Sequence, residues 1–140
     1  MTDIAEKLLP AEILAKADFR QNEYAWRIAD LPQVIEAARA LGLRNIGGQL
    51  QIRTPDAIGE CDWVQIDACQ LIPPVLPWEA QVEMAANVAL QDLQMLKAEF
   101  NFGKEISEAF PEPVARFIEA GGTLEEAVWF VWYVDTEETA

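Results

Sequence analysis

The feature that most constrains the fold is the stretch from Gly42 to Ala68, which has the pattern of two strands joined by a turn. Apolar and polar residues alternate over 46–53 and again over 61–68, which is the period of a strand with one buried face. Between them Pro55, followed by an aspartate, is typical of a tight turn. The pattern predicts a hairpin whose amide and charged side chains lie on a face open to water.

Periodicity elsewhere adds two strands and two helices to this hairpin. Residues 23–28 alternate as a strand, and residues 128–134 are apolar at consecutive positions, as expected for a central strand. Residues 31–41 and 78–100 repeat apolar side chains at helical spacing. The sequence therefore predicts an α+β fold with a four-stranded, mostly antiparallel sheet and helices packed on one face.

The length of 140 residues suits one domain that buries a single core, and we take 1–140 as that domain. Residues 1–20 are predicted to form an N-terminal helical segment that Pro10 kinks or divides. Residues 23–134 form the predicted core of sheet and helices, and the polar residues 135–140 are predicted to form a frayed tail.

The formal net charge of −14 constrains the class of partner. A surface of this charge repels phosphate backbones and anionic lipid, so neither nucleic acid nor a membrane is an expected partner, whereas a basic protein is. The chain shows no signal-peptide pattern and no long apolar run, which indicates a cytoplasmic protein. Cys61 and Cys69 flank the second strand of the hairpin, too far apart along an extended strand to form a disulfide.

The residue types present give little support for an enzyme or for a protein that binds a metal or cofactor. The chain contains no histidine, which removes the commonest general base and the usual zinc ligand. The acidic residues from 105 to 126 are spaced as on helix faces, not as in a calcium loop, so we expect no metal. Gly47 and Gly48 are followed by no phosphate-binding motif, and a strand bulge explains them better. We expect a protein that is not an enzyme and carries no cofactor.

A mixture of an aromatic ring, amides and charges on the wet face of the hairpin resembles a recognition surface. Trp63 shares its side of the second strand with Gln65 and Asp67, and the first strand is expected to place three polar side chains on the same face of the sheet. Cover by the proline-rich segment 70–77 is the alternative for Trp63. The predicted partner-binding residues are Gln49, Gln51, Arg53, Trp63, Gln65 and Asp67.

Several short patterns together resemble the small immunity proteins of bacterial polymorphic-toxin systems. The resemblance covers roughly residues 23 to 134 and rests on a helix that ends in Gly-Leu, a strand that opens with Gly-Gly, an acidic-aromatic pair, a long helix led by tryptophan and an apolar closing strand, namely Gly42-Leu43, Gly47-Gly48-Gln49, Asp62-Trp63, Trp78 and 130–134. It implies a non-enzymatic bacterial protein that binds and neutralises one toxin domain. An acidic protein would complement a basic toxin.

Two other classes of function stay open. A structural or assembly subunit could dimerise through the aromatic strand 128–134, and the sequence does not decide between a monomer and a homodimer. A small enzyme could use paired carboxylates that include Asp62 or Asp67, which requires a concave pocket around them.

Overall fold

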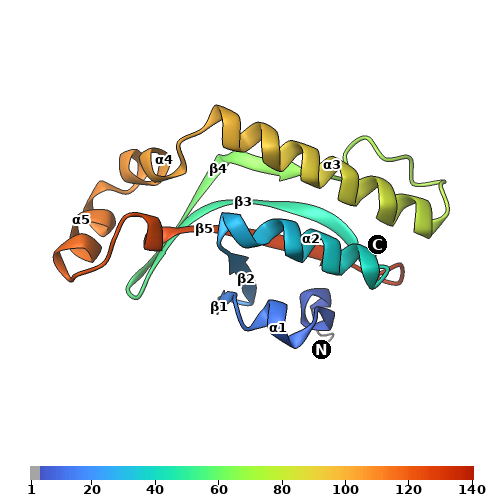
Figure 1. Cartoon of the computed structure of the whole chain (residues 1–140), viewed down its shortest axis with the longest axis horizontal. Coiled ribbons are helices and arrows are strands. Elements are labelled where there is room, and N and C mark those ends of the chain that lie inside the picture. Colours follow the sequence, from blue (N-terminus) through green and yellow to red (C-terminus); the bar gives the residue numbers. More distant parts are fainter. Residues whose placement is uncertain (1–3) are drawn as a thin grey trace.

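The computed structural model describes residues 4–140 and shows an α+β fold in which helices pack against a five-stranded antiparallel sheet (Figure 1). The strand order is β1-β2-β5-β3-β4. The strands are β1 (Asp18–Arg20), β2 (Glu23–Trp26), β3 (Arg44–Thr54), β4 (Ala57–Asp67) and β5 (Val128–Asp135). The helices are α1 (Ala11–Leu14), α2 (Leu31–Ala40), α3 (Trp78–Glu99), α4 (Phe102–Ala109) and α5 (Pro111–Glu119), with short 3-10 turns η1 (Ala5–Leu8), η2 (Ile28–Asp30) and η3 (Glu125–Ala127).

Strand β5 is the central strand, as its apolar run predicted. It pairs with β3 along most of its length and with β2 over two residues. Past the end of β2, the turn η1 occupies the vacant edge of β5, where the buried carboxylate of Glu6 accepts a hydrogen bond of 2.8 Å from the Val134 amide. Both edges of β5 are thus occupied, and Phe130 and Trp132 are fully buried.

Helices α2 and α3 lie side by side and cover one face of the sheet (Figure 1). The apolar side chains between this helical layer and the sheet form the main core, and burial of each large one stabilises the fold by about 1.5–3 kcal/mol. The turn after α2 contains Gly42, which has a φ of 72°. Its carbonyl oxygen accepts a hydrogen bond of 2.8 Å from the Trp78 indole, which ties this turn to the start of α3. Fully buried core side chains include Leu31, Val34, Ile35, Leu50, Ile52, Leu93, Phe130 and Trp132.

The structure corrects several predicted boundaries. The sheet has a fifth strand, β1, which joins β2 through a tight turn in which Gln21 and Asn22 have positive φ. The predicted strand 23–28 ends at Trp26, and η2 follows at once. Pro10 divides the N-terminal segment into η1 and α1. The predicted helix 78–100 is confirmed as α3, and α4 follows as a separate helix whose start is capped by the Asn101 side chain, which accepts a hydrogen bond of 3.1 Å from the Lys104 amide.

The predicted hairpin forms, but its two strands are not in continuous register. Gln49 lies opposite Gln65, whereas the next residue of β3, Leu50, lies opposite Cys61. Residues 62–64 therefore form a bulge on β4. The paired glycines also have a packing role, because a Cβ on Gly48 would lie 1.7 Å from the Val131 carbonyl oxygen. No helix among residues 4–140 is long and apolar enough to cross a membrane.

Candidate functional site

The six predicted contact residues do not form one surface. Gln51 and Arg53 are 0% and 1% exposed, so the prediction that they face water is wrong. Leu50 and Ile52 are fully buried in the core. Alternation along β3 is therefore confirmed for the core side, but the opposite face is closed to water at this end of the strand.

Curling of the sheet closes that face. Pairing between β3 and β5 ends at Ile52, and the β1–β2 hairpin comes within reach of the last residues of β3. Arg53 Nη1 donates hydrogen bonds to the carbonyl oxygens of Asp18 (2.8 Å) and Glu23 (3.4 Å) and to the Asp18 carboxylate (3.0 Å). Arg20 Nη1 reaches back to the Thr54 carbonyl oxygen at 2.6 Å. Arg53 thus joins strands that are not neighbours in the sheet.

Polar side chains continue this network from Arg53 toward β4. Arg53 Nε donates to Gln51 Oε1 at 2.8 Å, and the amides of Gln51 and Gln49 donate to one carboxylate oxygen of Glu60 at 3.4 and 3.2 Å. Gln49 is half-buried as a result. Within residues 4–140, Arg53 Nη2 is a buried side-chain nitrogen without a hydrogen-bond partner. The network therefore holds the curled end of the sheet together and leaves little of it for a partner.

The electrostatics of Asp18 reflect the two arginines beside it. Burial acts to raise the pKa of its carboxyl group, but hydrogen bonds from Arg20 and Arg53 outweigh burial, and the pKa lies below its ordinary value of 3.8. Asp18 is therefore held as a carboxylate, which balances the buried guanidinium of Arg53.

The remaining predicted contacts lie on β4, an edge strand of the sheet. Trp63 is 52% exposed, and its indole N–H donates to Glu105 of α4 at 2.8 Å, so the proline-rich segment does not cover it. No ion pair within residues 4–140 includes Glu60, Asp62 or Asp67. We refer to the exposed side chains of this strand as the acidic β4 edge: Glu60, Asp62, Trp63, Gln65 and Asp67.

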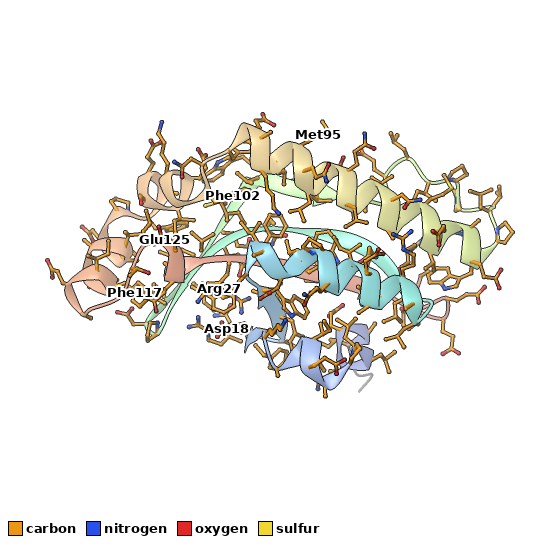
Figure 2. The ribbon with its side chains drawn as sticks, viewed as in Figure 1. Asp18, Arg27, Met95, Phe102, Phe117 and Glu125 are labelled. Carbon is orange, nitrogen blue, oxygen red and sulfur yellow. The ribbon has the colours of Figure 1, made fainter. Side chains whose placement is uncertain are left out.

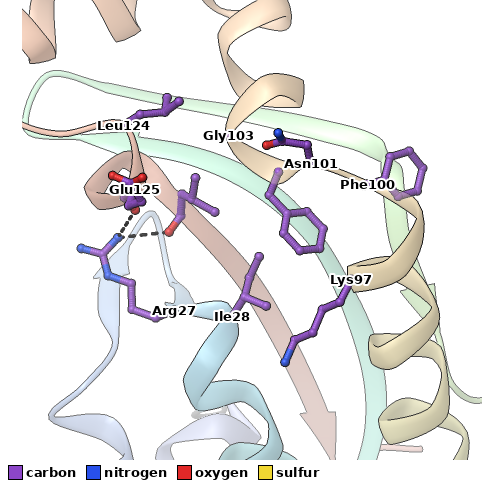
Figure 3. A pocket seen from close by; sticks show the side chains of 10 residues that line it. Arg27, Ile28, Lys97, Phe100, Asn101, Gly103, Leu124 and Glu125 are labelled. Carbon is purple, nitrogen blue, oxygen red and sulfur yellow. Dashed lines mark hydrogen bonds between the residues drawn. The ribbon is translucent and has the colours of Figure 1, made fainter.

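A hollow of about 660 Å³ lies at the other side of α4, where α3, α4 and η3 meet the end of β2. Figure 2 shows Arg27, Phe102 and Glu125, which come from separate segments, gathered at this end of the molecule. We call it the Lys97 hollow. It is lined by Arg27, Ile28, Lys97, Phe100, Asn101, Phe102, Gly103, Leu124, Glu125 and Val128 (Figure 3).

Arg27 fixes one wall of the Lys97 hollow. Its Nη1 donates to the carbonyl oxygens of Glu125 (3.2 Å), Glu126 (2.7 Å) and Val128 (3.1 Å), and its guanidinium lies 3.8 Å from the ring centre of Trp129. These contacts bind the start of β5 to the end of β2. Sequence reasoning identified no residue of this hollow as functional, because its walls come from three segments far apart in the chain.

The structure adds two observations on other classes of site. Within residues 4–140, no three side chains of histidine, cysteine, aspartate or glutamate gather where they could hold a metal ion. Both Cys61 and Cys69 are free thiols. Burial raises the pKa of Cys61 to about 11, with the nearby carboxylates of Glu105 and Asp62 acting in the same direction, so this thiol is held in its less reactive protonated form.

The comparisons with known proteins find no relative for this chain. It matches no protein-family model, no curated protein and no solved structure.

Proposed function

We propose that this chain is a non-enzymatic protein-binding domain of the immunity type, which neutralises a bacterial toxin by binding a basic surface of it. The observation that supports the proposal is an exposed tryptophan on an edge strand, restrained by a hydrogen bond to Glu105, beside carboxylates that form no ion pair with any residue from 4 to 140. The acidic β4 edge is the contact surface, and the long-range field of the net charge of −14 favours a basic partner.

Trp63 has the properties of an energetic anchor. Tryptophan is enriched among the residues that contribute most to protein-protein affinity. The hydrogen bond to Glu105 restrains its indole before binding, so less side-chain entropy is lost when a partner covers the ring. Asp62, Gln65 and Asp67 are exposed on the same strand and supply acceptors along it.

The partner contacts side chains rather than adding a strand to β4. The bulge at 62–64 interrupts the regular edge, and charged side chains on an edge strand discourage pairing with another strand. The contact set is therefore revised: Trp63, Gln65 and Asp67 are kept, Glu60 and Asp62 are added, and Gln49 is peripheral. Gln51 and Arg53 support the sheet from beneath.

The two alternative functions have weaker support. Asp62 and Asp67 are exposed on β4 and do not border the Lys97 hollow, whereas an enzyme needs its carboxylate in a concave site. Strand β5 is occupied on both edges, so a dimer formed by strand pairing would have to use an edge strand of the sheet, β1 or β4, and not the aromatic strand. A strict monomer by light scattering argues against that subunit role.

The test begins with the gene that lies immediately upstream of the gene for this chain: a metabolic enzyme there would count against the immunity function, whereas a secreted toxin is expressed together with this chain in bacteria. We expect the chain to rescue growth and to bind the toxin domain more tightly at low salt than at high salt. A double variant, Trp63→Ala with Asp62→Asn, is expected to lose rescue and to weaken binding by about a hundredfold or more, as for a hot-spot residue.

Met95→Ala is the matched control, since Met95 is a large apolar side chain, 60% exposed, on the outer face of α3 (Figure 2). It is expected to keep full rescue and affinity. Equal binding by the double variant and the wild type would rule out the acidic β4 edge as the contact surface. Absence of any binding to the toxin domain would reject the immunity function.

A further inference from the structure

The Lys97 hollow combines the size and the apolar lining of a small-molecule site. Its volume of about 660 Å³ lies within the range of drug-sized ligand pockets. Its five apolar side chains all pack against the hydrophobic core and are all only half-buried, so they present apolar surface to the hollow: Ile28, Phe100, Phe102, Leu124 and Val128. An apolar ligand body would remove this surface from water.

Two cations border the same hollow in a strongly acidic protein. Lys97 makes no ion pair or hydrogen bond with any residue from 4 to 140, which sets it apart from Lys104, whose ammonium pairs with Glu108. Figure 3 shows Lys97 extending from α3 and Arg27 from the opposite wall. Arg27 uses Nη1 for three carbonyl oxygens, and Nη2 and Nε make no hydrogen bond within the described residues. Glu125 is the one carboxylate of the lining.

The first turn of α4 adds backbone donors to this wall. The first amides of a helix have no intrahelical acceptor, and the positive end of the helix dipole favours an anion there. Asn101 accepts the hydrogen bond of the Lys104 amide, and Phe102 and Gly103, whose amides belong to the first turn of α4, line the hollow. Close packing also favours glycine at position 103, because a Cβ there would lie 2.9 Å from Leu124 Cδ2.

We propose that the Lys97 hollow binds a small organic acid, a monocarboxylate with an aromatic or branched apolar body. The carboxylate lies at the Lys97 ammonium, with the positive charge of Arg27 across the hollow adding to the attraction, and the apolar body lies against Ile28, Phe102 and Leu124. A single negative charge fits a lining with two cations and one carboxylate, whereas a phosphate dianion would meet Glu125 and find few polar partners on the apolar wall. This site is separate from the acidic β4 edge and does not depend on its function.

Titration of the full chain with benzoate and 3-phenylpropionate, followed by ¹H–¹⁵N correlation spectra, tests the site. We expect shifts at the amides of 100–103 and 124–128. The neutral analogue 3-phenylpropionamide should bind at least about tenfold more weakly because it lacks the charge, and acetate should not bind measurably because it lacks the body.

Lys97→Gln is expected to weaken binding of the better acid about tenfold, and Lys104→Gln, an equal charge change outside the hollow, should leave it unchanged. Both residues are exposed, so both variants should fold. Equal affinity for acid and amide, an unaffected Lys97→Gln variant, shifts centred elsewhere, or no binding of either acid up to about 10 mM would each overturn the proposal.

Discussion

Arg53 on β3 and Trp63 on β4 belong to one hairpin, yet Arg53 is 1% exposed and Trp63 is 52% exposed. Arg53 lies where the β1–β2 hairpin folds over the sheet, and its guanidinium meets backbone oxygens of both strands. Trp63 lies in the bulge of the outer strand, where its indole N–H donates a hydrogen bond to Glu105 of α4. The comparison shows that neighbours in one hairpin can have opposite roles, one in stability and the other in recognition.

Because of this difference in burial, Arg53 and Trp63 contribute differently to the free energies of unfolding and of binding. A buried cation has lost its hydration, so it depends on every hydrogen bond that the fold offers and its removal leaves other groups unpaired. A half-exposed ring at an edge loses little when it is truncated in the free protein, and its contribution appears only when a partner covers it. Variants at the two positions should therefore separate stability from binding.

The largest effect is expected from Arg53→Ala. It removes the buried guanidinium that pairs with the partly exposed Asp18 carboxylate, leaves the Asp18 and Glu23 carbonyl oxygens without this donor and opens space under the curled strands. The free energy of unfolding should fall by about 3–5 kcal/mol, measured by urea denaturation. A loss below about 1 kcal/mol would show that water replaces these contacts and that the curled end contributes little to stability.

The pH dependence of stability should show the same pair with a smaller effect. Because the pKa of Asp18 is lowered in the folded chain, its stabilising contribution is complete above the ordinary value of 3.8 and is lost as the pH falls through the lowered pKa. Burial raises the pKa of Glu6, which contributes with the opposite sign, so the difference between the wild type and Asp18→Asn isolates Asp18.

Urea denaturation between about pH 6 and pH 3 measures this difference. Asp18→Asn should be less stable than the wild type at the higher pH, and the two curves should converge as the pH falls. A constant difference across this range would contradict the assignment of a lowered pKa to Asp18.

The smallest effect on stability is expected at the acidic β4 edge. Trp63→Ala should change the free energy of unfolding by no more than about 1 kcal/mol, close to Met95→Ala, because both side chains are more than half exposed. Thermal unfolding of the two variants and the wild type is the measurement. A loss at Trp63 as large as that at Arg53 would mean that the ring belongs to the core and would remove the anchor from the proposed binding surface.

Several features of the fold followed from short-range patterns. The left-handed Gly42 after α2 was predictable because a helix end favours glycine there. The spacing of Thr123 and Glu126 is likewise typical of a capping box, which the structure shows, with the Thr123 amide 2.9 Å from the Glu126 carboxylate. Strand β1 was missed because three residues before a turn carry too little periodicity. The Lys97 hollow was missed because residues 27, 97 and 124 become neighbours only in the folded chain.

Alternation along the chain assigned Leu50 and Ile52 to the core and placed their polar neighbours on the other side, because successive side chains of a strand point in opposite directions. It carried no information on what covers that other side. Gln51 and Arg53 are buried because the β1–β2 hairpin, distant in the sequence, curls over them. Trp63 stays half-exposed in a bulge of β4, where it contacts α4. Which side a residue faces is a local property of the backbone, whereas access to water depends on segments that meet only when the whole sheet has formed.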